Sequence, residues 1–547
     1  MIKVTIDQQV YEFTEPQTIL QACTAVGIKI PTLCYEKSIG AIASCRVCLV
    51  KVVGRRGFVT ACNTQIAEGM QIITQDKAVW QARKNILELL LSDHRFDCEH
   101  CARAEDCRLK RFALEYGAEQ STYAPSQPLP AVEKNPKHIV RDNAKCIRCG
   151  RCIKVCQEMQ QVGVLGTLGR GFEGKIGCAF GESLSTTNCI SCGQCVANCP
   201  TGALVEASNL PLLIEKLRDP QIHCVVATAP SVRVALGEGF GLPSGTNVQG
   251  KMVSALRHAG FDKVFDLDFA ADLTVMQEGA ELLGRLRSGK NLPQFTSCCP
   301  GWVNYVEQVH PELIQHLSTA KSPMGMLGAV IKSYYAQKIN LDPQKIFTVM
   351  LMPCIAKCDE ITRDDIQDVD MVLTTRVAIQ FLKQQGIDLA QMPDSEFDNP
   401  LALSSGAGWM FGTSGGVCEA TLRTLQDQLP RPLKSIVVSG IANAEKLIQQ
   451  IKAGQADYDF IEVMACVGGC VNGGGQPCDT GLIQDNRGNA QKRAETIKQM
   501  DRYQSLRKSS DNPAIQQLYR EFLGSPDSKL AEELLHTRFH DRSQKSK

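Results

Sequence analysis

Residues 460–477, FIEVMACVGGCVNGGGQP, join a buried strand to a loop that carries Cys466 and Cys470. The run FIEVMAC is short and apolar, which is typical of a strand covered on both faces. In α/β folds, ligand sites lie where such strands end. The glycines that follow let the backbone approach a bound group closely. The stretch therefore predicts an α/β fold with a thiolate site at the end of a strand.

The same strand pattern recurs through the C-terminal part of the chain. The other runs are HCVVATAP (223–230), KVFDLD (263–268), FTVMLMPC (347–354), MVLTT (371–375) and SIVVSG (435–440). Helical patterns such as 273–288 separate them, so the alternation predicts parallel sheets covered by helices. We expect a large two-lobed α/β domain over 210–547, in which the charged helical tail 492–547 wraps the rest.

Composition limits the class of protein. The 547 residues contain 59 Lys plus Arg and 58 Asp plus Glu, a net charge of +1 that indicates neither a nucleic-acid nor a membrane partner. The chain opens MIKVTIDQQVYEF, without the apolar segment of a signal peptide, and no run approaches the roughly 18 apolar residues of a membrane helix. With 26 cysteines, we expect a reduced, cytoplasmic metalloprotein.

Residues 1–80 show short strand patterns and a first group of cysteines. The spacing C-x10-C-x2-C-x13-C is formed by Cys34, Cys45, Cys48 and Cys62. A tight C-x2-C loop with one distant cysteine on each side can hold a [2Fe–2S] cluster, and the order resembles a β-grasp, plant-type ferredoxin domain. The first gap is longer than is typical there. Zinc is the alternative for such a pair.

Residues 81–125 carry a second group of ligands. They are His94, Cys98, Cys101 and Cys107. The spacing H-x3-C predicts that His94 and Cys98 lie one helical turn apart on one face. Three cysteines and one histidine also suit zinc. The neighbouring cluster motifs favour a [4Fe–4S] cluster with one imidazole ligand.

Residues 126–209 contain the most specific general motif of the chain. After a Pro-rich linker at 126–144, two C-x2-C-x2-C-x3-C runs follow, which is typical of a bacterial ferredoxin domain with two [4Fe–4S] clusters. The runs comprise Cys146, Cys149, Cys152 and Cys156, then Cys189, Cys192, Cys195 and Cys199. In that pattern the fourth cysteine of each run binds the other cluster. We therefore expect Cys199 to bind the cluster of the first run and Cys156 to bind the cluster of the second. The first 209 residues thus predict four clusters in series.

Two further cysteine loops, TSCCPGW (296–302) and MPCIAKCDE (352–360), complete the C-terminal set. The three loops together offer Cys298, Cys299, Cys354, Cys466 and Cys470. Four thiolates suffice for one cluster, and one sulfur is left over. The loops complete the motifs TSCCPxW, MPCxxKxxE and ExMACxxGCxxGGGxP. Over essentially its whole length the chain therefore resembles the iron-only ([FeFe]) hydrogenases, of the monomeric type with four accessory clusters.

This resemblance implies an H-cluster, in which a [4Fe–4S] cube joins a two-iron subsite bearing carbonyl, cyanide and an azadithiolate bridge. The implied cube ligands are Cys299, Cys354, Cys466 and Cys470, the last of which bridges to the subsite. Lys357 and the Ser231 region, with Pro230, are implied to bind the cyanides. Met352 and Met464 are implied to pack against the two irons, although a methionine beside a cysteine is otherwise typical of a core.

Cys298 is the sulfur that the cube does not need. A thiol near its own pKa can give and take a proton. Glu278 and Glu281 lie three residues apart on one face of the predicted helix 273–288. Together with Ser318 they match the family's Cys–Glu–Ser–Glu proton path at the same offsets from Cys298. Without that match, two helical glutamates would indicate a solvated helix face.

The resemblance implies an enzyme that reversibly reduces protons to H2. It also implies ferredoxin or flavodoxin as the electron partner and maturation proteins that install the two-iron subsite. One alternative is an electron-transfer subunit of an NADH dehydrogenase, which shares the order of sites in residues 1–200; the three complete motifs argue against it. Others are an H2 sensor, an NADH-linked bifurcating subunit, or an iron–sulfur assembly factor, against which the intact Cys298 and Lys357 argue.

Three positions depart from the pattern of better-known members. Cys358 stands where Lys is common, Cys418 where Met is common, and Met324 where Gln is common. One interpretation is drift among buried residues, because free cysteine packs as a small apolar group. The other is that these residues retune the two-iron site and so change its directional bias, potential or oxygen tolerance.

Overall fold

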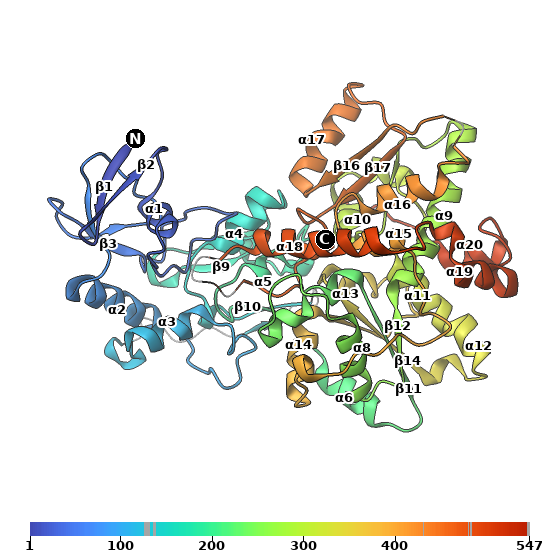
Figure 1. Cartoon of the computed structure of the whole chain (residues 1–547), viewed down its shortest axis with the longest axis horizontal. Helices are drawn as coiled ribbons and strands as arrows, with labels where there is room; N and C mark the ends of the chain where they lie inside the picture. The colour runs from blue at the N-terminus through green and yellow to red at the C-terminus, as the bar shows by residue number, and fades with distance from the viewer. Residues whose placement is uncertain (125–131, 135–137, 430, 480, 482–483, 544–547) are drawn as a thin grey trace.

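The chain runs from a small N-terminal sheet through a cysteine-rich middle segment to a large block of sheets and helices (Figure 1). The computed structural model describes residues 1–124, 132–134, 138–429, 431–479, 481 and 484–543. In Figure 1 the blue N-terminal sheet lies at the opposite end of the molecule from α19 and α20, with the cyan and green middle segment between. The N-terminal sheet and the large block therefore lie on opposite sides of the middle segment.

A mixed sheet of strand order β2-β1-β5-β3-β4 forms the N-terminal region. Its strands are β1 (Ile2–Ile6), β2 (Gln9–Phe13), β3 (Leu49–Val52), β4 (Val59–Thr60) and β5 (Gln71–Ile73). Helix α1 (Ile19–Ala25) begins at a capping box of Thr18 and Gln21 and packs Cys23 into the core, as the sequence predicts. Helices α2 (Lys77–Ser92) and α3 (Arg108–Tyr116) follow.

The segment between α2 and α3 corrects one prediction. Helix α2 ends at Ser92, so His94 and Cys98 lie in a loop and not one helical turn apart. The His94 N–H closes the last turn on Leu91 O (3.0 Å), and the Arg95 N–H then donates to Ala144 O (2.7 Å). This contact with the next region draws the backbone out of the helix.

The middle segment is built from short elements. Strands β10 (Leu204–Glu206), β7 (Ile139–Arg141) and β6 (Glu133–Lys134) form one sheet in that order, and β8 (Gly166–Leu168) pairs with β9 (Lys175–Gly177). The short helices are α4 (Arg151–Lys154) and α5 (Gln194–Ala197). The predicted linker 126–144 is thus partly wrong, because β7 pairs with β10 and β6. Most of its Pro-rich part lies outside the described residues.

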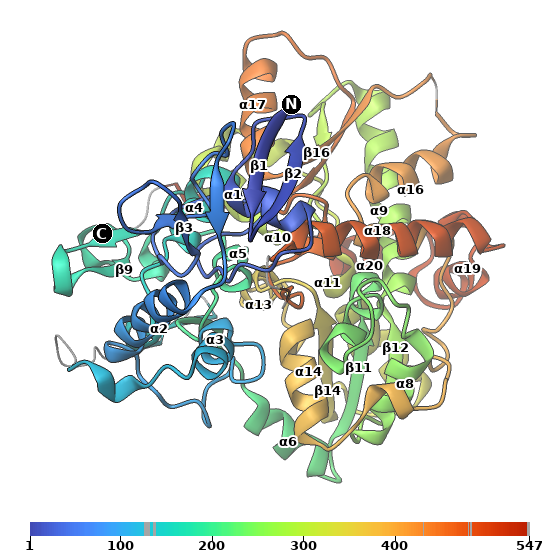
Figure 2. The ribbon, with the colours of Figure 1, turned by 60° about the vertical axis from the view of Figure 1, so that its left-hand side comes forward.

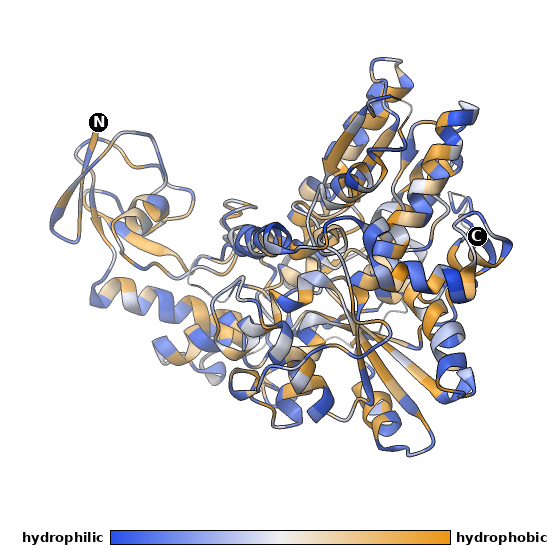
Figure 3. Cartoon of the chain, turned by 45° about the vertical axis from the view of Figure 1, so that its right-hand side comes forward, coloured by the Kyte–Doolittle hydropathy of each residue, from blue (hydrophilic) through white to orange (hydrophobic). Residues whose placement is uncertain are grey.

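The first lobe of the large block surrounds a parallel sheet of order β12-β11-β14-β15, as the alternating pattern predicts. Its strands are β11 (His223–Thr228), β12 (Lys263–Asp266), β14 (Ile346–Met352) and β15 (Met371–Thr374). Its helices are α6 (Leu210–Arg218), α7 (Pro230–Arg233), α8 (Gln249–His258), α11 (Pro323–Val330), α12 (Ala336–Lys338), α13 (Ala356–Glu360) and α14 (Thr375–Gln384). Figure 3 shows hydrophobic strands inside this block and hydrophilic residues along the outer helices.

The second lobe holds the parallel sheet β13-β17-β16. Its strands are β13 (Gln294–Phe295), β16 (Ser435–Ser439) and β17 (Phe460–Met464), and its helices are α10 (Pro300–Val309), α15 (Gly406–Trp409), α16 (Gly416–Leu425) and α17 (Ile441–Lys452). The long helix α9 (Leu267–Ser288) packs against α11 on one side and α15 and α16 on the other. It therefore joins the two lobes.

The C-terminal tail packs along the large block, as predicted. It contains α18 (Asn486–Tyr503), α19 (Pro513–Leu518) and α20 (Lys529–Leu535). Helix α18 packs against α15 and α7, and α20 packs against α11. Figure 2 shows the tail crossing the face of the block. Among the described helices, none combines the length and apolarity needed to cross a membrane.

Candidate active site

Three cysteine loops meet at the carboxyl ends of parallel strands. The loop after β13 carries Cys298 and Cys299, the loop after β14 carries Cys354, and the loop after β17 carries Cys466 and Cys470. The strands belong to both sheets, so the loops meet where the two lobes face each other. This is the position that α/β folds use for ligands.

The glycines of the 462–477 loop explain how these loops pack so closely. A Cβ at Gly473 would collide with the backbone of Pro353, and one at Gly474 would collide with the backbone of Cys192. The loop is therefore held between the Cys354 loop and the middle segment. Glycine is required here for close approach of protein backbone.

The four sulfurs assigned to the cube lie close enough to perturb one another. Burial raises the pKa of Cys470, and Cys299 and Cys354 raise it further. Burial likewise raises the pKa of Cys466, with further contributions from Cys354, Cys192 and Cys299. Buried thiols that repel each other's charge need bound cations before they ionise together, so this donor set fits an iron–sulfur cluster.

Lys357 places a buried cation beside these sulfurs. Its Nζ donates to Cys298 O (3.2 Å) and Ser322 Oγ (2.7 Å) and pairs with Glu360 Oε2 (2.6 Å). Its charge opposes the rise in the pKa of both Cys354 and Cys470. The ammonium group therefore stabilises thiolates and is able to donate to an anionic ligand.

The residues predicted to contact the two-iron subsite are buried around the same loops. Ser231, in the short helix α7 that Pro230 opens, has a buried Oγ without a hydrogen-bond partner among the described residues. Met464 packs in a cluster with Cys298 and Cys299, and Met352 lies in the core of the first lobe. An unpartnered hydroxyl is costly unless a ligand accepts its proton, so Ser231 fits the cyanide-binding role.

Gln476 is a residue of this site that the sequence did not single out. Its Nε2 donates to Ser231 O (3.0 Å) and Cys470 O (3.3 Å), and its buried Oε1 has no partner in the described chain. It occupies the variable position of GGGxP, so motif spacing alone does not point to it. The amide fixes the loop of Cys470 against α7.

The predicted proton-path residues form a connected group on α9 and the 318–320 segment. Glu278 is 1 % exposed, and burial, with Glu281 and Glu462 nearby, raises its pKa to about 8. The Ser318 Oγ–H donates to Glu281 Oε2 (2.8 Å), and Arg285 pairs with Glu281 Oε1 (2.6 Å). Burial and Glu278 raise the pKa of Cys298. A carboxyl group with a pKa of about 8, as Glu278 has, is suited to proton transfer near neutral pH.

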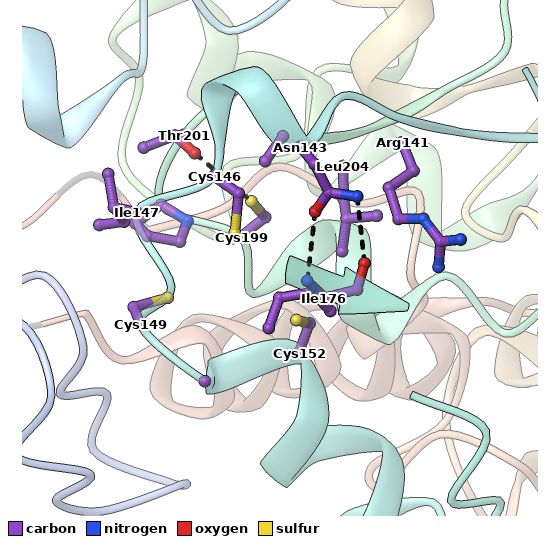
Figure 4. A pocket seen from close by; sticks show the side chains of 13 residues that line it. Arg141, Asn143, Cys146, Ile147, Cys149, Cys152, Ile176, Cys199, Thr201 and Leu204 are labelled. Carbon is purple, nitrogen blue, oxygen red and sulfur yellow. Dashed lines mark hydrogen bonds between the residues drawn. The ribbon is translucent and has the colours of Figure 1, made fainter. Parts of the chain in front are cut away.

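Two cavities gather the cysteines of the middle segment, and the fourth cysteine of each run lines the cavity of the other run. The first is lined by Cys146, Cys149, Cys152 and Cys199 (Figure 4). The second is lined by Cys156, Cys189, Cys192 and Cys195. Each cavity has predominantly apolar walls and four converging sulfurs, which is the environment of a [4Fe–4S] cluster.

The N-terminal cysteines also converge. Cys34, Cys45, Cys48 and Cys62 are buried together. Hydrogen bonds among their sulfurs lower the pKa of Cys34 and Cys48 and contribute to the raised pKa of Cys45 and Cys62. Four buried sulfurs within hydrogen-bonding reach of one another can act together as cluster ligands.

His94 is buried in the neighbouring loop. Burial, with Lys145, lowers its pKa to about 4, and its Nδ1 has no partner among the described atoms. A neutral imidazole with a free nitrogen fits a ligand role. Across the described residues no three His, Cys, Asp or Glu side chains gather tightly enough to hold a single metal ion.

The middle segment contacts the cube loops directly. Gln194, between two cysteines of the second run, donates from Nε2 to Cys466 Sγ (3.1 Å) and Asn472 O (2.6 Å). Cys192 packs in the same apolar cluster as Cys299. The second cavity therefore adjoins the sulfurs predicted to bind the cube.

Fold and site together define a multi-cluster iron–sulfur oxidoreductase. Family models match the chain from end to end: "2Fe-2S iron-sulfur cluster binding domain" (1–77), "NADH-ubiquinone oxidoreductase-G iron-sulfur binding region" (83–122), "NADH-quinone oxidoreductase subunit 3, ferredoxin-like domain" (137–205), "Iron only hydrogenase large subunit, C-terminal domain" (222–474) and "Iron hydrogenase small subunit" (487–542).

Similar proteins agree with these matches. The "NADP-reducing hydrogenase subunit HndD" of Solidesulfovibrio fructosivorans is 42 % identical, with 99 % of each chain covered. "Iron hydrogenase 1" of Clostridium pasteurianum is 36 % identical, covering 98 % of this chain and 100 % of its own. The apo [FeFe]-hydrogenase HydA1 structure from Chlamydomonas reinhardtii matches 61 % of this chain and 99 % of its own, with a TM-score of 0.55 and 36 % identity. The chain belongs to the [FeFe]-hydrogenase family, oxidoreductases that act on H2.

Proposed function

We propose that this hydrogenase catalyses both H2 evolution and H2 oxidation, with protons carried by Cys298, Glu278, Ser318 and Glu281. The observation that supports this path most directly is the buried, high-pKa Glu278, which lies close to both Cys298 and Ser318. Glu278 Oε2 is buried without a hydrogen-bond partner among the described residues. Such burial costs free energy, which a role in proton transfer would explain.

The proposed cube ligands are Cys299, Cys354, Cys466 and Cys470, and Cys470 is also the proposed bridge to the two-iron subsite. When bound, the H-cluster supplies the redox-active iron at which protons are reduced and H2 is split. Lys357 and Ser231 contribute donors to its anionic ligands, Pro230 shapes the start of α7, and Met352 and Met464 supply apolar, adaptable contacts.

Each proton carrier has a defined task. Cys298 Sγ exchanges a proton with the active site and with Glu278. Because the pKa of Glu278 is raised to about 8, its carboxyl group holds a proton near neutral pH and releases it readily. The Ser318 hydroxyl already donates to Glu281 Oε2, so it can pass its proton outward while it receives another. Glu281, with a side chain 15 % exposed, is the outer group.

We propose four accessory clusters that carry electrons. Their ligands are Cys34, Cys45, Cys48 and Cys62 for a [2Fe–2S] cluster; His94, Cys98, Cys101 and Cys107 for a [4Fe–4S] cluster; and the two cavity sets of 126–209 for two more. The proposed divisions are 1–80, 81–125, 126–209 and 210–547. A cytoplasmic location and maturation by separate proteins stay predictions.

Two electron partners are candidates. The first is ferredoxin or flavodoxin. The second is an NADP-linked partner subunit. It is favoured because a relative that covers 99 % of this chain is named as an NADP-reducing hydrogenase subunit. H2 evolution by the purified chain with reduced ferredoxin or flavodoxin supports the first. Activity with NADPH that requires an added nucleotide-binding subunit supports the second.

An infrared spectrum of the matured protein tests the proposed site. Carbonyl and cyanide bands, together with iron in the amount that five clusters require, are expected. The Cys354→Ser variant should lose the bands, whereas Cys23→Ser, which alters a buried cysteine of the N-terminal core, should keep them. A matured parent protein without these bands would refute the proposal.

A further inference from the structure

The C-terminal segment lies beside the outer end of the proposed proton path. Just after α20, residue His536 pairs with Ala320 in an antiparallel bridge. The Lys321 N–H donates to Leu535 O (2.8 Å), and the Thr537 N–H donates to Thr319 O (2.8 Å). The backbone of the tail is thus fixed to the residues that follow Ser318.

The imidazole of His536 bridges two groups next to the path. Its Nδ1 lies 2.7 Å from Thr319 Oγ1, and its Nε2 lies 3.0 Å from Gln277 Oε1. Gln277 uses its other amide atom, Nε2, to donate to Tyr519 OH (2.7 Å), so its Oε1 is left as an acceptor. The neutral imidazole therefore carries its proton on Nε2 and accepts the Thr319 hydroxyl proton at Nδ1.

Thr319 connects this imidazole to Glu281. The Thr319 N–H donates to Glu281 Oε2 (2.9 Å), the same oxygen that accepts from Ser318 Oγ. Because the hydrogen bond to His536 restrains the Thr319 side chain, it also restrains the Thr319 backbone N–H that donates to Glu281. Gln277 precedes Glu278 on α9, so both hydrogen bonds of His536 end on residues adjacent to path residues.

The charged groups around His536 make it sensitive to pH. Burial lowers its pKa, Lys321 lowers it further, and Glu281 and Glu532 oppose this change. The imidazole is therefore neutral at neutral pH and gains a positive charge in acid. In that state Nδ1 becomes a donor to Thr319 Oγ1, the Thr319 hydroxyl proton must find another acceptor, and a positive charge stabilises the carboxylate form of Glu281.

We propose that His536 is a positioning residue for proton transfer, acting through Thr319 on Glu281 at the outer end of the path. This inference rests on the proposed Cys298–Glu278–Ser318–Glu281 path. It gives the C-terminal segment a role in the reaction besides packing.

Two substitutions separate the hydrogen bond from the charge. In His536→Asn, the amide oxygen keeps an acceptor for Thr319 but cannot gain a proton, whereas His536→Leu removes both functions. His540→Asn is the matched control, since His540 is exposed on the same segment and its N–H donates to Glu307. H2 evolution and oxidation are measured from pH 5 to pH 9 in the holoenzyme.

We expect His536→Leu to lower turnover about tenfold, less than the roughly hundredfold loss expected when a proton carrier itself is removed. Hydrogen exchange of the peptide containing Thr319 should be faster in this variant, which is a readout independent of turnover. His536→Asn should keep most activity but lose the inflection that His536 adds to the acidic side of the pH profile. His540→Asn should match the parent protein.

Glu281→Gln distinguishes failure of this inference from failure of the path. If Glu281→Gln retains full turnover, the proposed path is wrong. If Glu281→Gln is strongly impaired while His536→Asn and His536→Leu keep the parent's rate and pH profile, the path stands and the role of His536 is overturned.

Discussion

Replacing Glu278 by glutamine gives opposite expectations for activity and stability. The substitution keeps the size and hydrogen-bonding shape of a protonated carboxyl group but removes its proton chemistry. Glu278 is 1 % exposed, and its pKa is raised from 4.5 to about 8, first by burial and then by Glu281 and Glu462. That change corresponds to about 5 kcal/mol of preference for the protonated form in the folded protein.

The stability effect follows from proton linkage. Between pH 4.5 and about 8 the folded protein holds a proton on Glu278 that the unfolded chain has released. This group therefore reduces stability by about 1.4 kcal/mol for each pH unit gained in that window. Glutamine has nothing to ionise, so Glu278→Gln should be stabilised relative to the parent as pH rises from 6 to 8.5. Thermal unfolding of both proteins under anaerobic conditions measures the difference.

The activity effect has the other sign. Without a proton on residue 278, turnover should fall by roughly a hundredfold or more in both directions, as for loss of a general acid or base. Glu495→Gln, which alters an exposed residue of α18, is the control and should change neither quantity. The reasoning is refuted if Glu278→Gln keeps its turnover, or if its stability relative to the parent does not rise with pH.

Further substitutions test other parts of the site. Lys357→Met should destabilise the protein by about 3–5 kcal/mol because it leaves Glu360 buried without its cation, and adding Glu360→Gln should restore much of the loss in thermal unfolding. His94→Ala should remove one cluster's iron and electron paramagnetic resonance signal, and an unchanged signal would contradict a ligand role. Combining Met324→Gln with Cys418→Met should change the ratio of H2 evolution to oxidation if these buried residues retune the site, and an unchanged ratio would favour neutral drift.

Local patterns in the sequence predicted much of the fold. The apolar runs of the C-terminal part lie on β11, β12, β14, β15, β16 and β17, and both sheets are parallel as expected. Two local predictions failed because contacts with distant residues override the local pattern. The H-x3-C spacing suggested a helix at 94–98, but the Arg95 backbone bonds to Ala144, a distant residue that a helical pattern does not include. Strand β7 within the predicted linker exists because β10 and β6 supply its partners.

The sequence by itself determined the class of protein and the cysteines available to each cluster, because ligand spacing is a covalent property of the chain. Tertiary structure decided which groups meet. It holds Gln476 against Ser231 and sets His536 beside Thr319. These contacts join residues far apart along the chain. They depend on how α9 joins the two lobes and how the C-terminal tail packs across them, which no local spacing encodes.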